Sequence, residues 1–115
     1  MLPMKLLDWI DINKLDWSYL AINPNAIQLL NENKNRIDWA MLSENLNATE
    51  LLKANKDKII WFYLSINPNA IELLKERIVE ENEMDEEYLK NLPSNKKINW
   101  KELSKNPSIF EIILV

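Results

Sequence analysis

The chain has 115 residues, a net charge of −4 and no histidine, cysteine or glycine. These absences exclude disulfides, thiolate nucleophiles, imidazole bases and the usual zinc ligands, and a chain without glycine favours helices over tight hairpins and phosphate-binding loops. The acidic balance argues against a nucleic-acid partner, and no apolar run approaches the roughly 18 residues of a membrane span.

The first residues, MLPMKLLDWID, contain only a short apolar stretch, which Asp8 and Asp11 interrupt. We therefore predict no secretory signal peptide. A secreted chain of this size would often carry disulfides, so the sequence favours an intracellular protein without a membrane partner. Residues 1–14 look like a degenerate second half of the repeat described next, with Pro3 and the pair Leu6-Leu7 roughly in place, and are interpreted as a partial N-terminal cap.

The tryptophans reveal an internal repeat. Trp17, Trp39 and Trp61 are spaced by 22 residues, and Trp100 follows after 39, which is one period plus an insertion of 17. Repetition at such a period is typical of stacked helical units, because short helices are stable only when neighbouring units cover them. We predict an all-α fold, a short α-solenoid of about four helix pairs in one domain. Its blocks are residues 15–36, 37–58, 59–77 and 98–115, with an acidic insertion at about 78–95.

The first helix of each block is predicted to begin just before its tryptophan. Asp16 and Asp38 are good N-cap residues, and Asn99 is equally suitable in block four. Three positions further on, a leucine shares the face of the tryptophan, as Leu42 does with Trp39. This pattern predicts one buried stripe for each first helix.

The second helix of each block is predicted to open with Asn-Pro. Asn23, Asn67 and Asn106 suit the N-cap, and the prolines that follow them suit the first helical position, where a missing N–H costs nothing. An apolar stripe then follows, as in AIELL of block three. Asn33 and Asn55 are expected to cap the C-termini of these helices.

The insertion contains EENEMDEE, residues 80–87, with six acidic residues in eight. We expect an extension of the preceding helix, then a turn, then a second helix that leads to Pro93. The acidic run has neither the spacing nor the glycine of a calcium loop. A solvated face, or a contact for a basic partner, is the simpler interpretation.

Residues Ile59 to Leu74 read IIWFYLSINPNAIELL. This run resembles a family of short repeats that are abundant in proteins of giant DNA viruses of the Mimivirus type, with the approximate pattern Ile-Asp/Asn-Trp-x-x-Leu-Ser-x-Asn-Pro-Asn-Ala-Ile-x-Leu-Leu. The resemblance covers most of the chain outside the insertion. The sequence departs from the family pattern in block two, where Leu46 replaces proline and Thr49 replaces isoleucine. The resemblance implies a viral protein, in the host cytoplasm or the virion, and brings no catalytic residues.

Two columns of identical residues recur from block to block. The tryptophans could stack a ligand and the asparagines could bind a polar one, but packing between blocks and helix capping explain them more simply. We therefore interpret both columns as structural: Trp17, Trp39, Trp61 and Trp100, and Asn23, Asn67 and Asn106 with Asn45 between them.

Two other columns vary, and positions that face a partner are free to vary. They are candidates for partner binding, although packing against the next block is an equal alternative. The column two positions after tryptophan holds Tyr19, Met41, Tyr63 and Glu102, and the column before the asparagine holds Ile22, Glu44, Ile66 and Lys105.

No pair of carboxylates is marked for acid–base chemistry, so the sequence favours a protein without catalytic activity, cofactor or metal. The predicted function is a protein–protein interaction scaffold whose partner is unknown. The alternative is a structural component of a virion or homo-oligomer. That alternative depends on the run IFEIILV, residues 109–115, which has almost no polar cover and must either lie under the insertion or form an interface.

Overall fold

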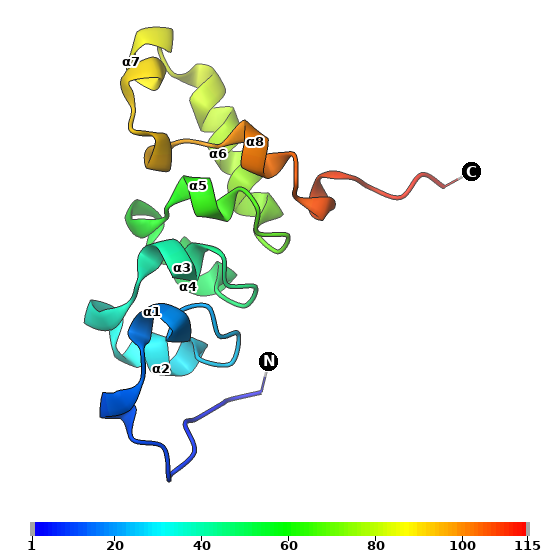
Figure 1. Cartoon of the computed structure of the whole chain (residues 1–115). Helices are drawn as coiled ribbons and strands as arrows, with labels where there is room; N and C mark the ends of the chain where they lie inside the picture. The colour runs from blue at the N-terminus through cyan, green and yellow to red at the C-terminus, as the bar shows by residue number, and fades with distance from the viewer. Residues whose placement is uncertain (1, 115) are drawn as a thin grey trace.

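The computed structural model describes residues 2–114, and every regular element in this range is helical, without a β-strand. The fold is therefore all-α, as predicted. Its principal extents are 51 × 43 × 21 Å and its radius of gyration is 16.0 Å, whereas a compact domain of this length has about 13 Å. Figure 1 shows the reason, since the helix pairs lie one above another rather than around one centre.

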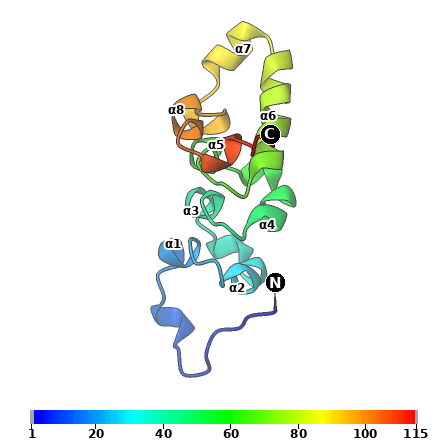
Figure 2. The same cartoon turned by 90° about the vertical axis from the view of Figure 1, so that its right-hand side faces the viewer.

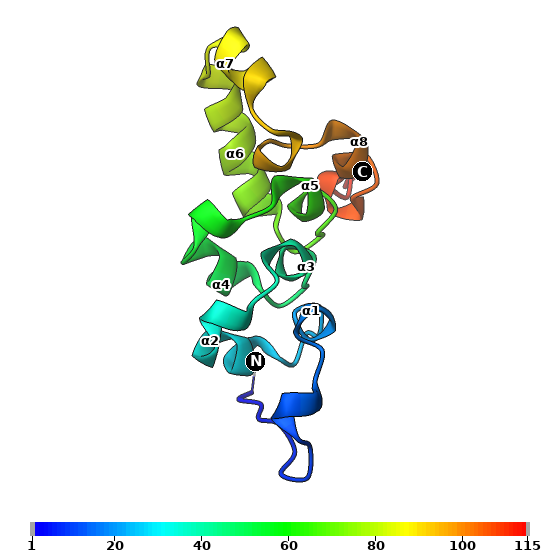
Figure 3. The ribbon, with the colours of Figure 1, turned by 60° about the vertical axis from the view of Figure 1, so that its left-hand side comes forward.

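The helices alternate between two sides of this stack. Figures 2 and 3 show α1, α3, α5 and α8 along one side and α2, α4 and α6 along the other. The α-helices are α1 (Trp17–Leu20), α2 (Ile27–Glu32), α3 (Trp39–Ser43), α4 (Thr49–Lys53), α5 (Trp61–Leu64), α6 (Ile71–Glu83), α7 (Glu86–Asn91) and α8 (Trp100–Leu103). Short 3₁₀ turns are η1 (Ile12–Lys14), η2 (Lys34–Arg36), η3 (Lys56–Lys58), η4 (Ser94–Lys96) and η5 (Pro107–Ile109). None of the helices in residues 2–114 is long and apolar enough to cross a lipid bilayer.

The N-caps predicted for the first helices are confirmed. The Asp16 carboxylate accepts from the backbone N–H groups of Ser18 and Tyr19, and Asp38 accepts from Met41. Asn99 does the same for α8. Capping is a local property, since the acceptor and the unpaired N–H lie two or three residues apart. These helix starts could therefore be predicted from single residues.

The N-caps predicted for the second helices are wrong at two of the three positions. Helices α2 and α6 have Ala26 and Ala70 as N-caps, so they begin three residues later than Asn-Pro predicts. The Asn23 side chain instead accepts from Asn25 N–H at 2.9 Å, and its carbonyl accepts from Ala26 N–H at 3.1 Å. Asn-Pro-Asn-Ala is thus a turn that precedes the helix. Only Asn106 caps as predicted, with Pro107 at the start of η5.

Of the two predicted C-caps, one is confirmed and one is wrong. Asn33 caps α2 as predicted, whereas α4 is capped by Ala54 and Asn55 lies one residue beyond. Both side-chain amides still donate to the carbonyl four residues earlier, at 2.9 Å. No described residue has a positive φ, so neither asparagine uses the left-handed conformation. The amide hydrogen bond, rather than the backbone, closes these helices.

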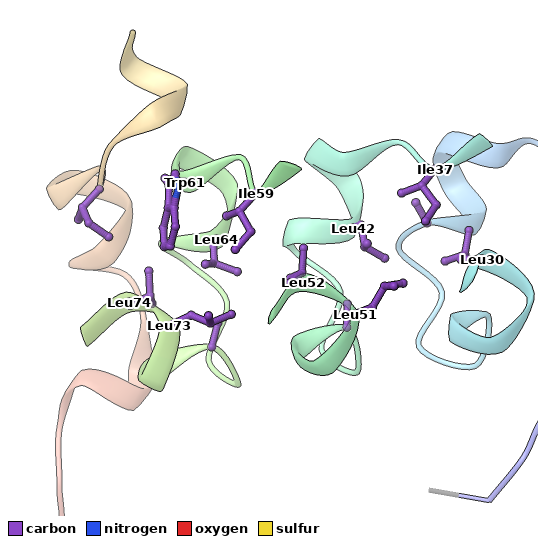
Figure 4. Packing of buried hydrophobic residues seen from close by; sticks show 14 of the residues in the cluster. Leu30, Ile37, Leu42, Leu51, Leu52, Ile59, Trp61, Leu64, Leu73 and Leu74 are labelled. Atoms are coloured by element: carbon purple, nitrogen blue, oxygen red, sulfur yellow. The ribbon is translucent and has the colours of Figure 1, made fainter. Parts of the chain in front are cut away.

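The core is a single row of apolar side chains that runs the length of the stack. Figure 4 shows leucines from both helices of successive pairs meeting in this row. Leu30, Leu42, Leu52, Leu64 and Leu73 are buried and come from five different helices. Helices of one or two turns are unstable alone, so this shared burial is what keeps them folded.

The insertion forms as predicted. Helix α6 extends to Glu83, a turn follows, and α7 begins behind an Asp85 cap and leads to Pro93. Its acidic run is not entirely solvated, because Glu81 is only 8% exposed. The Glu81 carboxylate accepts from Ile98 N–H at 2.8 Å and pairs with Arg77 at 3.1 Å. The insertion therefore fastens the start of block four to α6.

The ends of the chain depart from the repeat prediction. Residues 2–11 form no helix, but η1 lies 22 residues before η2, at the register that ends the second half of a block. Leu6, Leu7 and Ile10 line a hollow with Leu20 and Leu29. At the other end, η5 replaces the second helix of block four, and residues 110–114 are extended. Met1 and Val115 lie outside the described residues.

The missing helix has a steric cause at Ile109. In the three earlier blocks this position is Ala26, Ala48 or Ala70, and these side chains are 0–6% exposed. The Asn106 turn keeps both of its hydrogen bonds, from Ser108 N–H at 2.9 Å and from Ile109 N–H at 3.4 Å. A β-branched isoleucine cannot fit where a methyl group is already enclosed, so Ile109 is 43% exposed and the chain leaves the stack after the turn. Cover by the insertion does not occur, because Phe110, Ile112, Ile113 and Leu114 are 81–91% exposed.

Candidate interaction surface

The asparagine column joins the blocks by hydrogen bonds, which capping alone does not explain. The Asn45 amide donates to the carbonyls of Ala21 and Asn23, at 2.8 and 3.0 Å. Asn67 donates to Ser43 and Asn45 in the same way, and Asn106 donates to Ser65 and Asn67. Asn45, Asn67 and Asn106 are each 1% exposed. Their amides have no room for a ligand, so the column is structural.

Two further columns repeat this linkage, and the sequence interpretation missed both. Ser43 Oγ accepts from Ile60 N–H in the next block, and Ser65 Oγ accepts from Asn99 N–H, each at 3.1 Å. On the outer side, the Asn69 amide donates to the Leu46 carbonyl at 2.8 Å. Serine occurs at the same register in blocks two, three and four, and this identity was the available signal.

The tryptophan column is part of the packing, with an exception in block four. Trp61 is buried, and Trp17 and Trp39 pack partly buried against the core. Arginine from the following segment covers two of them, with Arg36 5.0 Å from the Trp17 ring centre and Arg77 5.3 Å from that of Trp61. Trp100 has no such cover and is 60% exposed.

The two variable columns lie together on the side of the first helices. Tyr19, Met41, Tyr63 and Glu102 come from α1, α3, α5 and α8 respectively, which share that side in Figure 3. Tyr19 is 75% exposed and Ile22 is 42% exposed. Met41, Tyr63 and Ile66 are partly buried, and Tyr63 packs edge-to-face on Phe62. The exposed part of this face is therefore concentrated at block one.

Two carboxylates from different columns and different blocks lie on this face, close enough for the charge of one to act on the other. Partial burial, with the nearby negative charge of Glu102 as a smaller cause, raises the pKa of Glu44 above its ordinary value. Glu102 in turn pairs with Lys105, at 3.1 Å between Nζ and Oε1. Like charges held together lower the cost of bringing a cation to this place. We name Tyr19, Ile22, Glu44, Ile66 and Glu102 the lateral face.

The raised pKa of Glu44 predicts a small effect on stability with a defined sign. The folded chain binds this proton more tightly than the unfolded chain, so stability is lost as pH rises through the folded pKa and regained as pH falls. We expect Glu44→Gln to raise the free energy of unfolding at neutral pH by ~0.5 kcal/mol or less, and to change nothing below the carboxyl pKa. Thermal denaturation at neutral pH and at a pH below the carboxyl pKa measures this change in stability. The control is Glu50→Gln, because the Glu50 carboxylate is exposed on α4. A loss of stability in Glu44→Gln at neutral pH would contradict the raised pKa of Glu44.

Outside the lateral face, the hollow beside the N-terminal segment and the distribution of acidic side chains bear on ligand binding. The hollow between the N-terminal segment and α2 and α4 has a volume of ≈ 450 Å³ and a single carboxylate, that of Glu50. No group of three acidic side chains in residues 2–114 is placed to hold a metal ion. Comparison of the chain with protein-family models, curated proteins and solved structures finds no match.

Proposed function

We propose that the chain is a short α-solenoid that binds another protein through the lateral face. The observation that carries the proposal is that exposed apolar groups and two carboxylates lie on the same side of the stack. Tyr19 and Ile22 supply exposed apolar area. Glu44 and Glu102 supply negative charge within the same face. The buried columns, in contrast, are occupied with holding the blocks together.

The chemistry of this face indicates a partner that presents a lysine or arginine beside apolar side chains. Glu102 already pairs with Lys105, so a cation of the partner would act chiefly on the partly buried Glu44 carboxylate, which a neutral partner cannot do. Tyrosine contributes contact area at low entropic cost and is enriched in protein interfaces. The face is therefore better suited to a basic, partly apolar protein segment than to a small polar ligand.

The resemblance to giant-virus repeats gives this proposal a setting. The partner would be a viral or host protein of the infected cell, met in the host cytoplasm or in the virion. A non-catalytic scaffold is consistent with buried columns whose side chains make the contacts between blocks. The alternative function, a structural homo-oligomer, depends on a different surface, which includes the exposed residues 110–114.

A capture experiment tests the proposal. Tagged chain, at near-native abundance in infected cells, is expected to co-purify with a specific protein that mass spectrometry identifies. The variant Tyr19→Ala with Ile22→Asp is expected to weaken that binding by at least about tenfold, because both changed side chains are exposed and central to the contact.

The matched control is Gln28→Ala with Asn31→Ala, on the exposed surface of α2. It is expected to bind like the original chain. Equal loss of binding in both variants would place the contact elsewhere, and capture of no specific protein would refute the interaction function. Circular dichroism of each variant confirms that the helices remain.

A further inference from the structure

An apolar groove lies on α6 where the other blocks place their next second helix. It has a volume of ≈ 300 Å³, and its lining includes Ile71, Leu74, Ile78, Val79 and Leu103. The floor of the groove is buried as in the earlier blocks, since Leu74, the equivalent of Leu30 and Leu52, is 2% exposed. Its open side is different, because Val79 is 51% exposed. The groove therefore offers apolar area on the side where a second helix of block four would lie.

The segment that would fill this groove has a matching apolar sequence but lies outside the groove. Residues 110–114, the apolar arm, align with IELLK of α6, so that Phe110 matches Ile71 and Ile113 matches Leu74. Figure 1 shows this arm projecting away from the stack. The arm thus keeps the apolar pattern of a packed helix without the contacts of one.

The arm cannot reach its own groove in the way the other blocks do. That route passes through a buried alanine, which is Ala26, Ala48 or Ala70, and the larger Ile109 stands at this position. Ile109 and Ser108 form the rim of the groove, so the arm departs from the groove's edge. A groove and a matching arm that cannot meet within one chain can meet between two chains.

We propose that the apolar arm of a second copy of this chain occupies the groove on α6, and that two copies exchange arms reciprocally. Charge supports this pairing: the groove carries Lys75 and the arm carries Glu111, and neither has an ion-pair partner within residues 2–114. Two arms with four large apolar side chains each would bury roughly 1,200 Å² of arm surface, enough for a specific interface.

The exchange uses a surface separate from the lateral face. The groove lies on α6, whereas Tyr19 and Ile22 belong to the α1 end of the first-helix side. Failure of the dimer would therefore leave the proposed partner binding intact, and failure of partner binding would leave the dimer intact.

Sedimentation equilibrium at concentrations up to about 100 μM tests the exchange. The unmodified chain is expected at twice the mass of one 13.7 kDa chain. Val79→Asp in the groove and Ile113→Asp in the arm are each expected to weaken the dimer at least about tenfold. Both side chains are exposed in the single chain, so neither change should unfold it. Leu46→Asp, at a comparably exposed apolar position far from the groove, is the control and should remain a dimer.

Mixing the two weakened variants distinguishes exchange from other contacts. Val79→Asp retains a sound arm and Ile113→Asp retains a sound groove, so the mixture is expected to form a mixed dimer that neither variant forms alone. A monomeric unmodified chain, a mixture that stays monomeric, or equal weakening by Leu46→Asp would each overturn the proposal. Persistence of the dimer in both variants would do the same.

Discussion

Asn67→Ala is expected to lower the free energy of unfolding by about 3–5 kcal/mol, enough to unfold a small domain of ordinary stability. The Asn67 amide donates to the carbonyls of Ser43 and Asn45, and its side-chain oxygen accepts from Asn69 N–H. Alanine would remove the donor to the Ser43 carbonyl and the acceptor of the Asn69 N–H at a position that is 1% exposed, and the Asn45 carbonyl would keep only the N–H of Ala48. Each buried polar group left unpaired costs ~1–3 kcal/mol, because water cannot replace the lost hydrogen bond.

Asn23→Ala is the matched control for this prediction. Asn23 has the same place in block one and makes the same turn, but its side chain is exposed and donates to no preceding block. We expect a loss of about 1 kcal/mol or less, the cost of the turn alone. Denaturant unfolding measures both variants. Equal losses would mean that the turn, and not the linkage between blocks, is what Asn67 contributes.

The features that could be predicted from the sequence are those that depend on neighbouring residues. Asp16 and Asp38 cap the first helices because the carboxylate and the free N–H groups are two or three residues apart. The extension of α6 and the helix before Pro93 follow equally from local helix propensity and from proline. The period of the tryptophans supplied the order in which these local elements recur.

The features that could not be predicted depend on residues a whole block away. The carbonyls that Asn45 bonds lie 22 and 24 residues earlier, so a local interpretation assigned its column to capping. Ile109 is a similar case, since only the buried alanines in register with it reveal that isoleucine does not fit. The helices after Asn23 and Asn67 begin later than predicted for a local reason, because each asparagine side chain accepts from the N–H two residues further on and closes a turn instead.

The exposure of the candidate residues could be predicted only in part. Tyr19 and Ile22 of the variable columns are exposed, whereas Tyr63 and Ile66 are partly buried. Glu44 and Glu102 belong to different columns and to blocks two and four, so their approach depends on the way the stack brings the helices together. Electrostatic coupling between non-adjacent blocks requires coordinates, because the repeat pattern relates only equivalent positions.

Glu81→Ala is expected to lower the free energy of unfolding by about 3 kcal/mol and to release the start of block four from α6. The Glu81 carboxylate is 8% exposed, and it is the partner of Arg77 and of the Ile98 N–H. Arg77, whose side chain is 15% exposed, would then be a nearly buried cation with one carboxylate fewer. Removing one member of such a pair is costly because the remaining charge has already lost its water.

Glu80→Ala separates this effect from the general loss of acidic charge. Glu80 pairs with the same arginine at 3.2 Å, but its side chain is 58% exposed. A surface pair of this kind is worth ~0.5 kcal/mol, so the control is expected to be nearly neutral. Hydrogen exchange adds a local measurement: the Ile98 amide should lose protection in Glu81→Ala and keep it in Glu80→Ala. An Ile98 amide that stays protected in Glu81→Ala would mean that packing of block four, rather than this carboxylate, holds the insertion in place.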